Sequence, residues 1–321
     1  MKNKKIAVIG AGMAGITIAR KLAQNNEVII FDKARGIGGR MATRRIGDYH
    51  FDHGAQYFTA KNSDFKELCK DALQNNVIAK WPAKIAYINY NSELDSTELY
   101  VAKPQMNSLC KYLAQDLQLK LEHKITKISY DGKKWTLIFT DNNKEQDFDL
   151  LIIAIPPAQL AELVTREFKY YTDLQKYKMT PCYSLMLGLK SKILYEFDAA
   201  KIKDQVIAWF AFNNHKPGRP GQTALLINTT NEWAAKNLEL ADDAVINNIV
   251  KNLNKFIKIT DENIEVTNLQ RWRYANIIPV LGQKSFFDAK LNLAICGDWL
   301  ISARVESAFL SATDLYKKIV E

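Results

Sequence analysis

A glycine-rich turn near the start of the chain constrains the fold more than any other feature of the sequence. The run Gly10-Ala11-Gly12-Met13-Ala14-Gly15 follows a β-branched segment, residues 5–9, and precedes an apolar helical pattern that extends to Asn25. A second β-branched segment, residues 28–31, ends at Asp32. A G-x-G-x-x-G run between a strand and a helix, within about thirty residues, is typical of a βαβ unit that binds a dinucleotide.

The residues of this turn have separate physical roles. Gly10 allows a tight turn, Gly12 lets the backbone approach a pyrophosphate, and Gly15 lets the helix pack closely on the strand. The first N–H groups of the helix, which opens at Met13-Ala14, face the phosphates. Asp32 lies seventeen residues after Gly15, where its carboxylate accepts ribose hydroxyls and disfavours a 2′-phosphate.

Composition and charge exclude several other classes of protein. Of the 321 residues, 47% are apolar and 25% are charged, which excludes a disordered chain, and 14 Gly and 8 Pro are too few for collagen-like repetition. No apolar run approaches the roughly 20 residues that span a bilayer. The formal charge of +9 is spread along the chain, and we interpret it as a solvated surface rather than a nucleic-acid-binding patch.

The cysteines and the N-terminus favour a cytoplasmic protein. Cys69, Cys110, Cys182 and Cys296 lie far apart and form no C-x-x-C pair, so we expect reduced thiols, no metal site and no disulfide framework. Structural sequence begins by Lys4, which leaves no room for a secretory signal segment.

The rest of the chain predicts two domains in an α/β fold. Helices are expected over 63–74, with Ser63 as N-cap, and from Pro104 to about Leu117. Residues 123–155 read as a β-meander that feeds a buried strand, and the pattern resumes at the C-terminus with a strand and a helix. The middle reads as a separate sheet-based domain. We expect a nucleotide-binding domain over 1–76, 104–163 and 284–321, and an inserted substrate domain over 77–103 and 164–283.

A second group of motifs carries a resemblance to a known family. Arg35-Gly36-Ile37-Gly38-Gly39-Arg40 directly follows the ribose-binding strand, and further phrases follow in order at 51–58, 154–156, 216–219, 271–275 and 296–299. Together they resemble flavoproteins of the amine-oxidase superfamily, most closely its renalase-like branch, over nearly the whole chain. The resemblance implies FAD as cofactor and a Rossmann-like FAD-binding domain with an inserted antiparallel-sheet α+β substrate domain.

The resemblance also implies which residues contact the cofactor. Gly38, Gly39 and Arg40 would hold the pyrophosphate and ribityl region, residues 54–58 would approach the isoalloxazine ring, and Ile125 would contact adenine. Asp298 would accept a ribityl hydroxyl, and a helix N-terminus at 304–306 would stabilise negative charge on the reduced ring. The expected contacts are Gly10, Gly12, Met13, Ala14, Gly15, Asp32, Lys33, Arg35, Gly39, Arg40, Met41, Gly54, Ala55, Gln56, Tyr57, Phe58, Ile125, Ala154, Pro156, Gly297, Asp298, Arg304, Val305 and Glu306.

A further set of side chains is expected to face the substrate. Trp299 follows Asp298 and should lie near the ring, and Arg271 and Arg273 should share one face of a strand, where they meet an anionic substrate or solvent. The expected residues are Tyr57, Phe58, Trp209, His215, Arg271, Trp272, Tyr274 and Trp299, with Arg273, Lys216 and Arg219 as additional cations for substrate phosphates.

Three of the four histidines can be interpreted either as site residues or as ordinary structural residues. His215 lies in a polar loop, where it either touches the substrate or is a solvated turn residue. His50 and His53 read as loop residues satisfied by backbone rather than as metal ligands, since no cysteine or further carboxylate stands at zinc spacing.

The resemblance implies an oxidase for small molecules. Its substrate would be a mis-reduced isomer of NAD(P)H, a 2- or 6-dihydronicotinamide dinucleotide that passes a hydride to flavin N5, after which O2 reoxidises the flavin to give H2O2. Such chemistry needs little acid or base from the protein. Two alternatives remain: a flavin-dependent amine oxidase, and a flavin-holding interaction protein without turnover. No nucleic-acid or membrane partner is expected, and the oligomeric state is undetermined.

Overall fold

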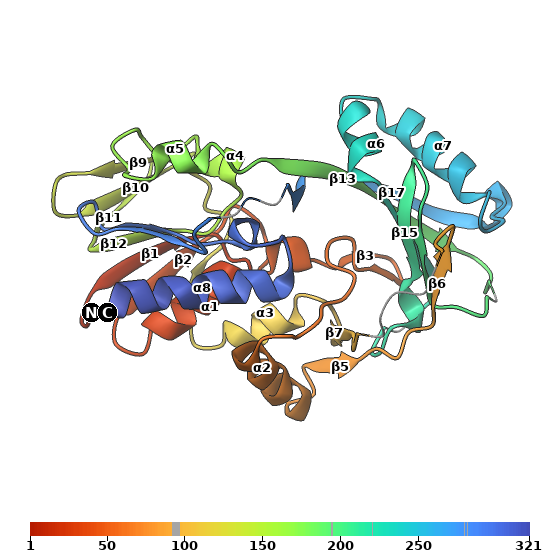
Figure 1. The fold of residues 1–321 in the computed structure, drawn as a ribbon, viewed down its shortest axis with the longest axis horizontal. Helices are drawn as coiled ribbons and strands as arrows, with labels where there is room; N and C mark the ends of the chain where they lie inside the picture. The colour runs from red at the N-terminus through yellow and green to blue at the C-terminus, as the bar shows by residue number, and fades with distance from the viewer. Residues whose placement is uncertain (92–96, 194, 220, 279, 281) are drawn as a thin grey trace.

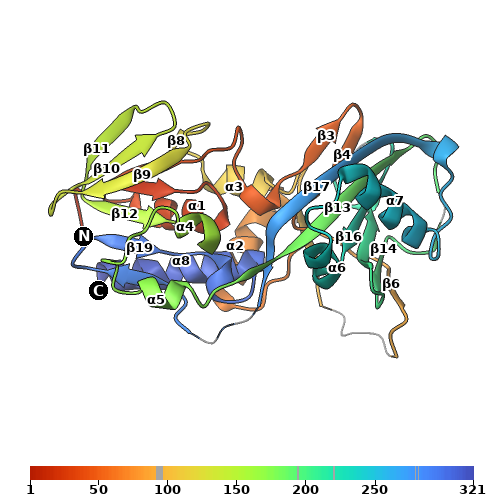
Figure 2. The ribbon, with the colours of Figure 1, turned by 90° about the horizontal axis from the view of Figure 1, so that it is seen from above.

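Two six-stranded sheets, each at the centre of one lobe, organise the computed structural model of the chain (Figure 1). The structure describes residues 1–91, 97–193, 195–219, 221–278, 280 and 282–321. The chain begins and ends in the same lobe, where the two termini lie side by side (Figures 1 and 2). Within the described residues, no helix is both long enough and apolar enough to cross a membrane.

The sheet of the first lobe is parallel except at one edge, where β18 runs antiparallel to β19. Its strands are, in order, β18 (Phe286–Asp288), β19 (Leu293–Ile295), β12 (Leu150–Ile153), β1 (Lys5–Ile9), β2 (Glu27–Phe31) and β8 (Gln118–Lys120). Ile6 and Val8 of β1 pack into one core and Ala7 and Ile9 into another. Burial on both faces explains why the central strands β1, β12 and β19 are nearly continuous apolar runs.

Helices cover one face of this sheet and a smaller sheet covers the other. The helical face carries α1 (Met13–Leu22), α2 (Ser63–Gln74), α3 (Ser108–Leu113) and α8 (Val305–Val320). The opposite face carries the antiparallel strands β9 (Ile125–Tyr130), β10 (Trp135–Phe139) and β11 (Lys144–Phe148), with the short helices α4 (Pro157–Leu160) and α5 (Tyr171–Leu174).

The second lobe is built on the other large sheet. Its strands are, in order, β17 (Ile264–Ile277), β13 (Met179–Leu189), β16 (Thr223–Thr229), β15 (Ile207–Phe212), β14 (Ala199–Ile202) and β6 (Ile85–Ile88). All neighbours are antiparallel except β14 and β6. The helices α6 (Asn231–Lys236) and α7 (Asp242–Leu253) cover one face, where Tyr183, Leu185 and Phe210 are buried.

The other face of this sheet carries Ser184 and Met186 and meets the hairpin of β3 (Arg44–Ile46) and β4 (Tyr49–Phe51), which comes from the first lobe. β5 (Ile78–Lys80) and β7 (Tyr100–Ala102), which are separated along the chain by β6, form a further two-stranded antiparallel sheet. The expected α/β architecture, a Rossmann-like sheet with a second sheet inserted, is confirmed.

The domain boundaries stay a proposal. In the proposed substrate segment 77–103, which includes the undescribed residues 92–96, β6 pairs in the second sheet while Ile78 and Val101 pack in the core of the first lobe.

Two local expectations were wrong. The helix expected from Pro104 begins only at Ser108, because the N–H of Met106 donates to Thr43 Oγ1 and that of Gln105 to Ser108 Oγ. The N-cap of α2 is Asn62 rather than Ser63, and its side-chain oxygen accepts the N–H groups of the first turn.

Candidate functional site

The glycine turn lies where β1 passes into α1. Gly10 has φ +108° and its N–H donates to the Phe31 carbonyl at 2.8 Å. A Cβ on Gly10 would lie 2.7 Å from the Ala154 oxygen, and a Cβ on Gly15 would lie 1.9 Å from the Gly10 oxygen. Neither position has room for a side chain, because the turn, the helix and the end of β12 are in direct contact.

Gly12 is different, because a Cβ there would meet no atom of the described residues within 4 Å. It is the N-cap of α1, and within the described chain the cap makes no side-chain hydrogen bond and the first turn holds no acidic residue. Open space in front of the first N–H groups of a helix that has no side-chain cap fits a pyrophosphate, because the positive end of the helix faces it.

Asp32 lies beside this turn at the end of β2. Its Oδ2 accepts the Ala11 N–H at 2.7 Å and its Oδ1 accepts the Ala34 N–H at 2.8 Å. Each carboxylate oxygen has a second lone pair, so both remain able to accept a ribose hydroxyl. Lys33 is engaged elsewhere, since its Nζ donates to Gln159 at 3.1 Å.

The second glycine motif packs against the first. The Gly38 N–H donates to the Ala11 carbonyl at 2.8 Å, and η1 (Gly39–Met41) follows. The Arg40 guanidinium pairs with Asp298 at 2.5 Å and donates to the Ala275 carbonyl at 3.3 Å. Arg40 therefore joins η1 to η4 (Asp298–Leu300) and to the second lobe.

The segment 54–58 is held directly against this motif. A Cβ on Gly54 would lie 2.0 Å from the Arg40 carbonyl oxygen, which also accepts the Ala55 N–H at 2.8 Å. The Tyr57 ring lies 5.5 Å from that of Trp209 and 6.3 Å from that of Trp81, between centroids. Burial raises the pKa of the Tyr57 hydroxyl, so this phenol is protonated at neutral pH.

The N-terminus of α8 reaches the same region. Its N-cap is Arg304, which makes no side-chain capping bond within the described chain and is close enough to Tyr57 to affect the pKa of that residue. Glu306 is buried, and its carboxylate accepts the N–H groups of Lys61 and Asn62, both at 2.7 Å. The helix end is thus tied to the chain that continues from segment 54–58.

Hydrogen bonds and close backbone packing therefore bring most expected cofactor contacts together: the two glycine motifs, Asp32, Arg40, segment 54–58, Asp298 and the start of α8. Their backbone cradle and two uncapped helix ends fit a dinucleotide-linked flavin. Ile125 pairs with Phe139 in the small sheet, and Ala154 and Pro156 follow β12 beside the glycine turn.

The second lobe presents a strand of alternating side chains. The Trp272 Nε1–H donates to the His53 carbonyl at 2.8 Å, and the two rings stack with centroids 5.3 Å apart. Burial lowers the pKa of His53 to about 4, so its imidazole is neutral. Tyr274 lies two residues further along β17, where the pairing with β13 is irregular.

The structure corrects the expectation for Arg271 and Arg273. They share one face of β17, as expected, but it is the face opposite Trp272. Arg271 pairs with Asp242 at 2.6 Å and lies over the Tyr183 ring, and Arg273 pairs with Glu239 at 2.6 Å. Both guanidinium groups are thus bound to the connection between α6 and α7, which removes them from the region of Tyr57.

Three further substrate assignments are corrected. Trp299 is buried in the core of the first lobe, where its Nε1–H donates to the Ile155 carbonyl at 3.1 Å. His215 is held by Asp198 through Nδ1 at 2.9 Å. The Phe58 side chain is buried against Tyr100, so only its backbone remains available.

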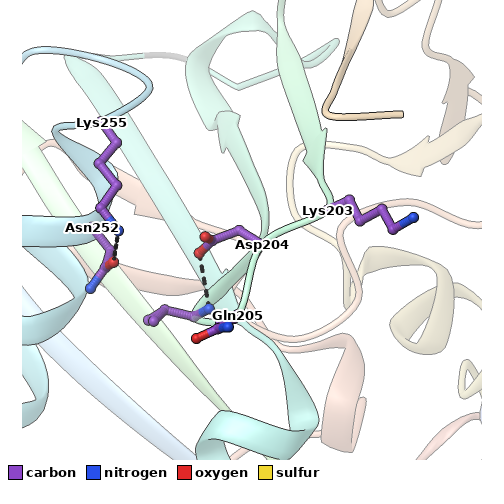
Figure 3. Close-up of a pocket in the computed structure, with 6 residues that line it drawn as sticks. Lys203, Asp204, Gln205, Asn252 and Lys255 are labelled. Carbon is purple, nitrogen blue, oxygen red and sulfur yellow. Dashed lines mark hydrogen bonds between the residues drawn. The ribbon is translucent and has the colours of Figure 1, made fainter. Parts of the chain in front are cut away.

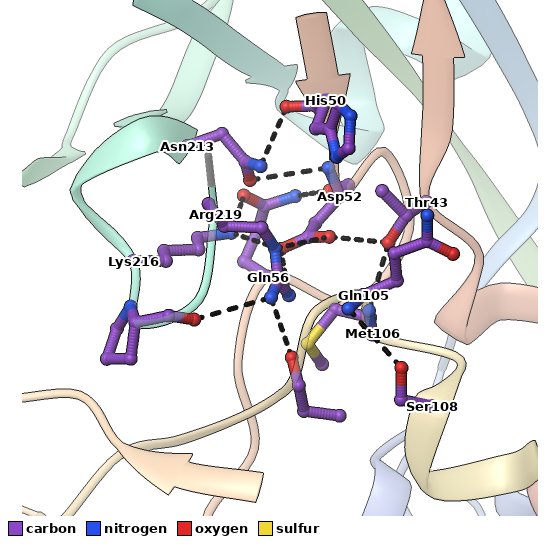
Figure 4. Close-up of polar contacts among 12 residues, drawn as sticks. Thr43, His50, Asp52, Gln56, Gln105, Met106, Ser108, Asn213, Lys216 and Arg219 are labelled. Atoms are coloured by element: carbon purple, nitrogen blue, oxygen red, sulfur yellow. Dashed lines mark hydrogen bonds and ion pairs between the residues drawn. The ribbon is translucent and has the colours of Figure 1, made fainter. Parts of the chain in front are cut away.

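Lys216 and Arg219 are also not at a pocket mouth, because both are buried and bound to Asp52 (Figure 4). The sequence interpretation missed Asp52 as their partner and Trp81 as a neighbour of Tyr57. The one available signal was an acidic residue inside the otherwise aromatic and histidine-rich run 49–58.

A pocket of about 500 Å³ occurs elsewhere, between the β14–β15 turn and α7 (Figure 3). It is lined by Lys203, Asp204, Gln205, Val206, Asn252 and Lys255. The Asp204 carboxylate already accepts hydrogen bonds from the N–H groups of Val206 and Ile207, and Lys255 donates one to Asn252. In the described part of the chain no three His, Cys, Asp or Glu side chains gather as a metal site, here or elsewhere.

Comparison with known proteins gives partial matches to curated sequences. Mouse renalase is 28% identical over 171 residues, which is 50% of this chain and 49% of renalase. A 4-hydroxybenzoate brominase (decarboxylating) from Pseudoalteromonas luteoviolacea is 29% identical over 154 residues, 47% of this chain and 25% of that protein. The chain thus spans half or less of the curated relatives that it matches.

A solved structure matches the whole fold. It is a chain from Exiguobacterium sp. 255-15, provisionally named a protoporphyrinogen oxidase, with a TM-score of 0.79 over 99% of both chains at 10% identity.

Family models cover nearly the full length. Residues 8–72 match an NAD(P)-binding Rossmann-like domain, and residues 83–314 match the flavin containing amine oxidoreductases. The second match alone covers well over half of the chain. The predicted resemblance and the predicted FAD cofactor are confirmed. The chain therefore belongs to the flavin containing amine oxidoreductases, a family of FAD-dependent oxidoreductases.

Proposed function

We propose that this chain is an FAD-dependent oxidase of 2- or 6-dihydronicotinamide dinucleotides. The cofactor, when bound, accepts a hydride and returns the electrons to O2, giving H2O2. We propose that Gly12, Gly39, Arg40 and the N-terminus of α1 hold the pyrophosphate and ribityl chain. Asp32 would hold the ribose, and segment 54–57 with the start of α8 would line the flavin ring.

The observation that carries the choice of substrate is a pair of buried indole donors beside Tyr57. Trp209 Nε1 and Trp81 Nε1 have no hydrogen-bond partner among the described residues. A buried donor without an acceptor is costly, so these groups favour a ligand that places an oxygen acceptor beside them. The carboxamide oxygen of a dihydronicotinamide supplies one, whereas an ammonium group supplies none and a neutral amine supplies only the nitrogen lone pair at the centre that is oxidised.

The chemistry asked of the protein is modest. Burial lowers the pKa of His53 to about 4, which makes it a weak base, and the Tyr57 phenol is protonated, so neither group is set to remove a proton at neutral pH. A dihydropyridine needs no base to release a hydride. The side chains would bind and orient the ring and exclude water.

The test is anaerobic mixing of the FAD-loaded protein with the two dihydro isomers and with monoamines and polyamines. We expect the flavin absorbance to bleach with a dihydro isomer and H2O2 to form once air is admitted. Bleaching by amines alone would make the chain an amine oxidase, and bleaching by none would favour a flavin-holding protein without turnover.

A variant sharpens the choice of substrate. Trp209→Phe keeps a smaller aromatic ring but removes the indole N–H, and we expect about a tenfold higher half-saturation concentration for the dihydro isomer, for one lost buried hydrogen bond. The matched control is Trp233→Phe, because Trp233 packs on Tyr183 at the opposite face of the sheet. Equal half-saturation for parent and Trp209→Phe would contradict the proposed contact.

A further inference from the structure

A buried charged network joins the two lobes next to segment 54–58 (Figure 4). Asp52 follows β4 in the first lobe, and Lys216 and Arg219 follow η2 (Asn213–His215) in the second. The side chains of all three are 0% exposed. Asp52 also accepts a hydrogen bond from Thr43 Oγ1 at 2.6 Å.

Arg219 and Asp52 form a complete pair by themselves. The guanidinium donates to Asp52 from Nε at 3.2 Å and from Nη2 at 2.9 Å, and from Nη1 to the Ala102 carbonyl at 2.7 Å. One carboxylate thus balances one guanidinium, and this pair has little capacity left. Lys216 is the surplus cation of the network.

The surroundings of Lys216 are otherwise neutral. Its Nζ donates to Asp52 at 3.1 Å and to Gln56 Oε1 at 3.2 Å, and it lies 5.4 Å from the centroid of the Trp81 ring. The charged groups that face it are Asp52 and Arg219. Burial lowers the pKa of Lys216 to about 8, with Asp52 opposing this effect and Arg219 adding to it.

This ammonium is one of three groups that hold the Gln56 amide. An ammonium only donates, so it must face Oε1, which leaves Nε2 to donate to the carbonyls of Asp52 and Gly54. Both carbonyls belong to the chain that leads into segment 54–58. Loss of the Lys216 proton would replace the charge-assisted hydrogen bond to Oε1 by a weaker neutral one, so the amide would be held less firmly in the same orientation.

We propose that protonated Lys216 is a positioning residue that fixes Gln56, and through it segment 54–58, against the flavin. The proposal rests on the proposed function only in placing this segment at the flavin ring. Loss of the Lys216 proton would loosen the segment without unfolding either lobe, because the Arg219–Asp52 pair would remain.

The experiment follows the FAD-loaded full chain without substrate from about pH 6 to pH 10. The readouts are the flavin absorbance spectrum and the FAD dissociation constant. We expect the parent to show a spectral transition near pH 8, with FAD binding about tenfold weaker above it, as for the loss of one charge-assisted hydrogen bond. Because no substrate is used, the result does not depend on whether dihydronicotinamides are oxidised.

Variants assign the transition to Lys216. Lys216→Arg, which stays charged, should show none, and Lys216→Met should resemble the high-pH parent at every pH. Lys203→Met is the matched control, since Lys203 lies on an exposed turn of the same lobe, and it should keep the transition. If circular dichroism shows that neither Lys216 variant folds, the proposal is tested with Gln56→Leu, which should abolish the transition. A parent without a transition, or any folded Lys216 or Gln56 variant with the parent's profile, would overturn the proposal.

Discussion

The two lobes differ in where their polar groups find partners. In the first lobe, the N-termini of α1 and α8 present backbone N–H groups without side-chain caps in the described chain. In the second lobe, Arg271, Lys216 and Arg219 are already paired with carboxylates of the protein. The comparison teaches that backbone donors are left for a ligand, whereas these cations stabilise the protein itself.

The strongest test of this contrast is Asp52→Ala. It leaves two buried cations without an anion, and we expect the free energy of unfolding to fall by about 3–5 kcal/mol. Thermal melting in excess FAD measures the loss. The control is Asp173→Ala, which breaks the exposed pair with Lys176 and should leave melting unchanged. Equal melting of the two variants would mean that the buried network contributes nothing to stability.

Gly12→Val tests the backbone cradle. The valine side chain has room in the protein, so the variant should fold. It occupies the proposed pyrophosphate space, however, and should weaken FAD binding about 100-fold or more, because overpacking of about 3 kcal/mol corresponds to that factor. Flavin content after gel filtration measures the effect. Gly15→Ala should behave oppositely and unfold the lobe, because its Cβ would lie 1.9 Å from the Gly10 oxygen. Full flavin content in Gly12→Val would refute the cradle.

His53 links the two lobes through Trp272 and supplies a pH test. Burial lowers its pKa to about 4 in the folded protein, against 6.5 in the unfolded chain. Between these values the unfolded chain binds the extra proton, so stability falls as the pH is lowered, by about 1.4 kcal/mol per pH unit. Denaturant unfolding at a series of pH values should show this slope, and His53→Gln should reduce it. If the stability of His53→Gln fell with pH as steeply as that of the parent, a group other than His53 would cause the acid sensitivity.

The smallest effect is expected for Arg271→Ala. Because Arg271 faces Asp242 on the outer side of β17, its removal should change FAD content and half-saturation by less than about twofold. Flavin titration and stopped-flow reduction measure both. A large rise in half-saturation for dinucleotides, and not for phosphate-free analogues, would restore the original assignment of Arg271 to the substrate.

Local patterns predicted the backbone well and the partners of side chains poorly. The strand, turn and helix at 5–22 and the helix Val305–Val320 occur as expected, because periodicity and glycine positions act within a few residues. The alternation that set Arg271 and Arg273 on one face was also correct. Which face of the sheet turns toward the first lobe depends on the hairpin at 44–51, and no pattern within β17 reports it.

The buried network shows the same limit more sharply. Asp52 and Lys216 are separated by 164 residues, and each alone reads as a surface charge. The prediction that Trp299 lies near the flavin ring was wrong for a related reason. Its position next to Asp298 in the sequence does not show where its side chain points, and the hydrogen bond to the Ile155 carbonyl holds its ring in the core.

The pairing of β13 with β17 has a mechanical consequence. Met179 and Ile277, paired at one end, pack on the core of the first lobe, while Leu189 and Ile264, at the other end, pack on the core of the second. The two strands run from lobe to lobe in both views (Figures 1 and 2). Two long hydrogen-bonded strands that connect the lobes resist hinge bending, so we expect the substrate to enter by local displacement of loops. X-ray scattering should then give the same radius of gyration with and without ligand.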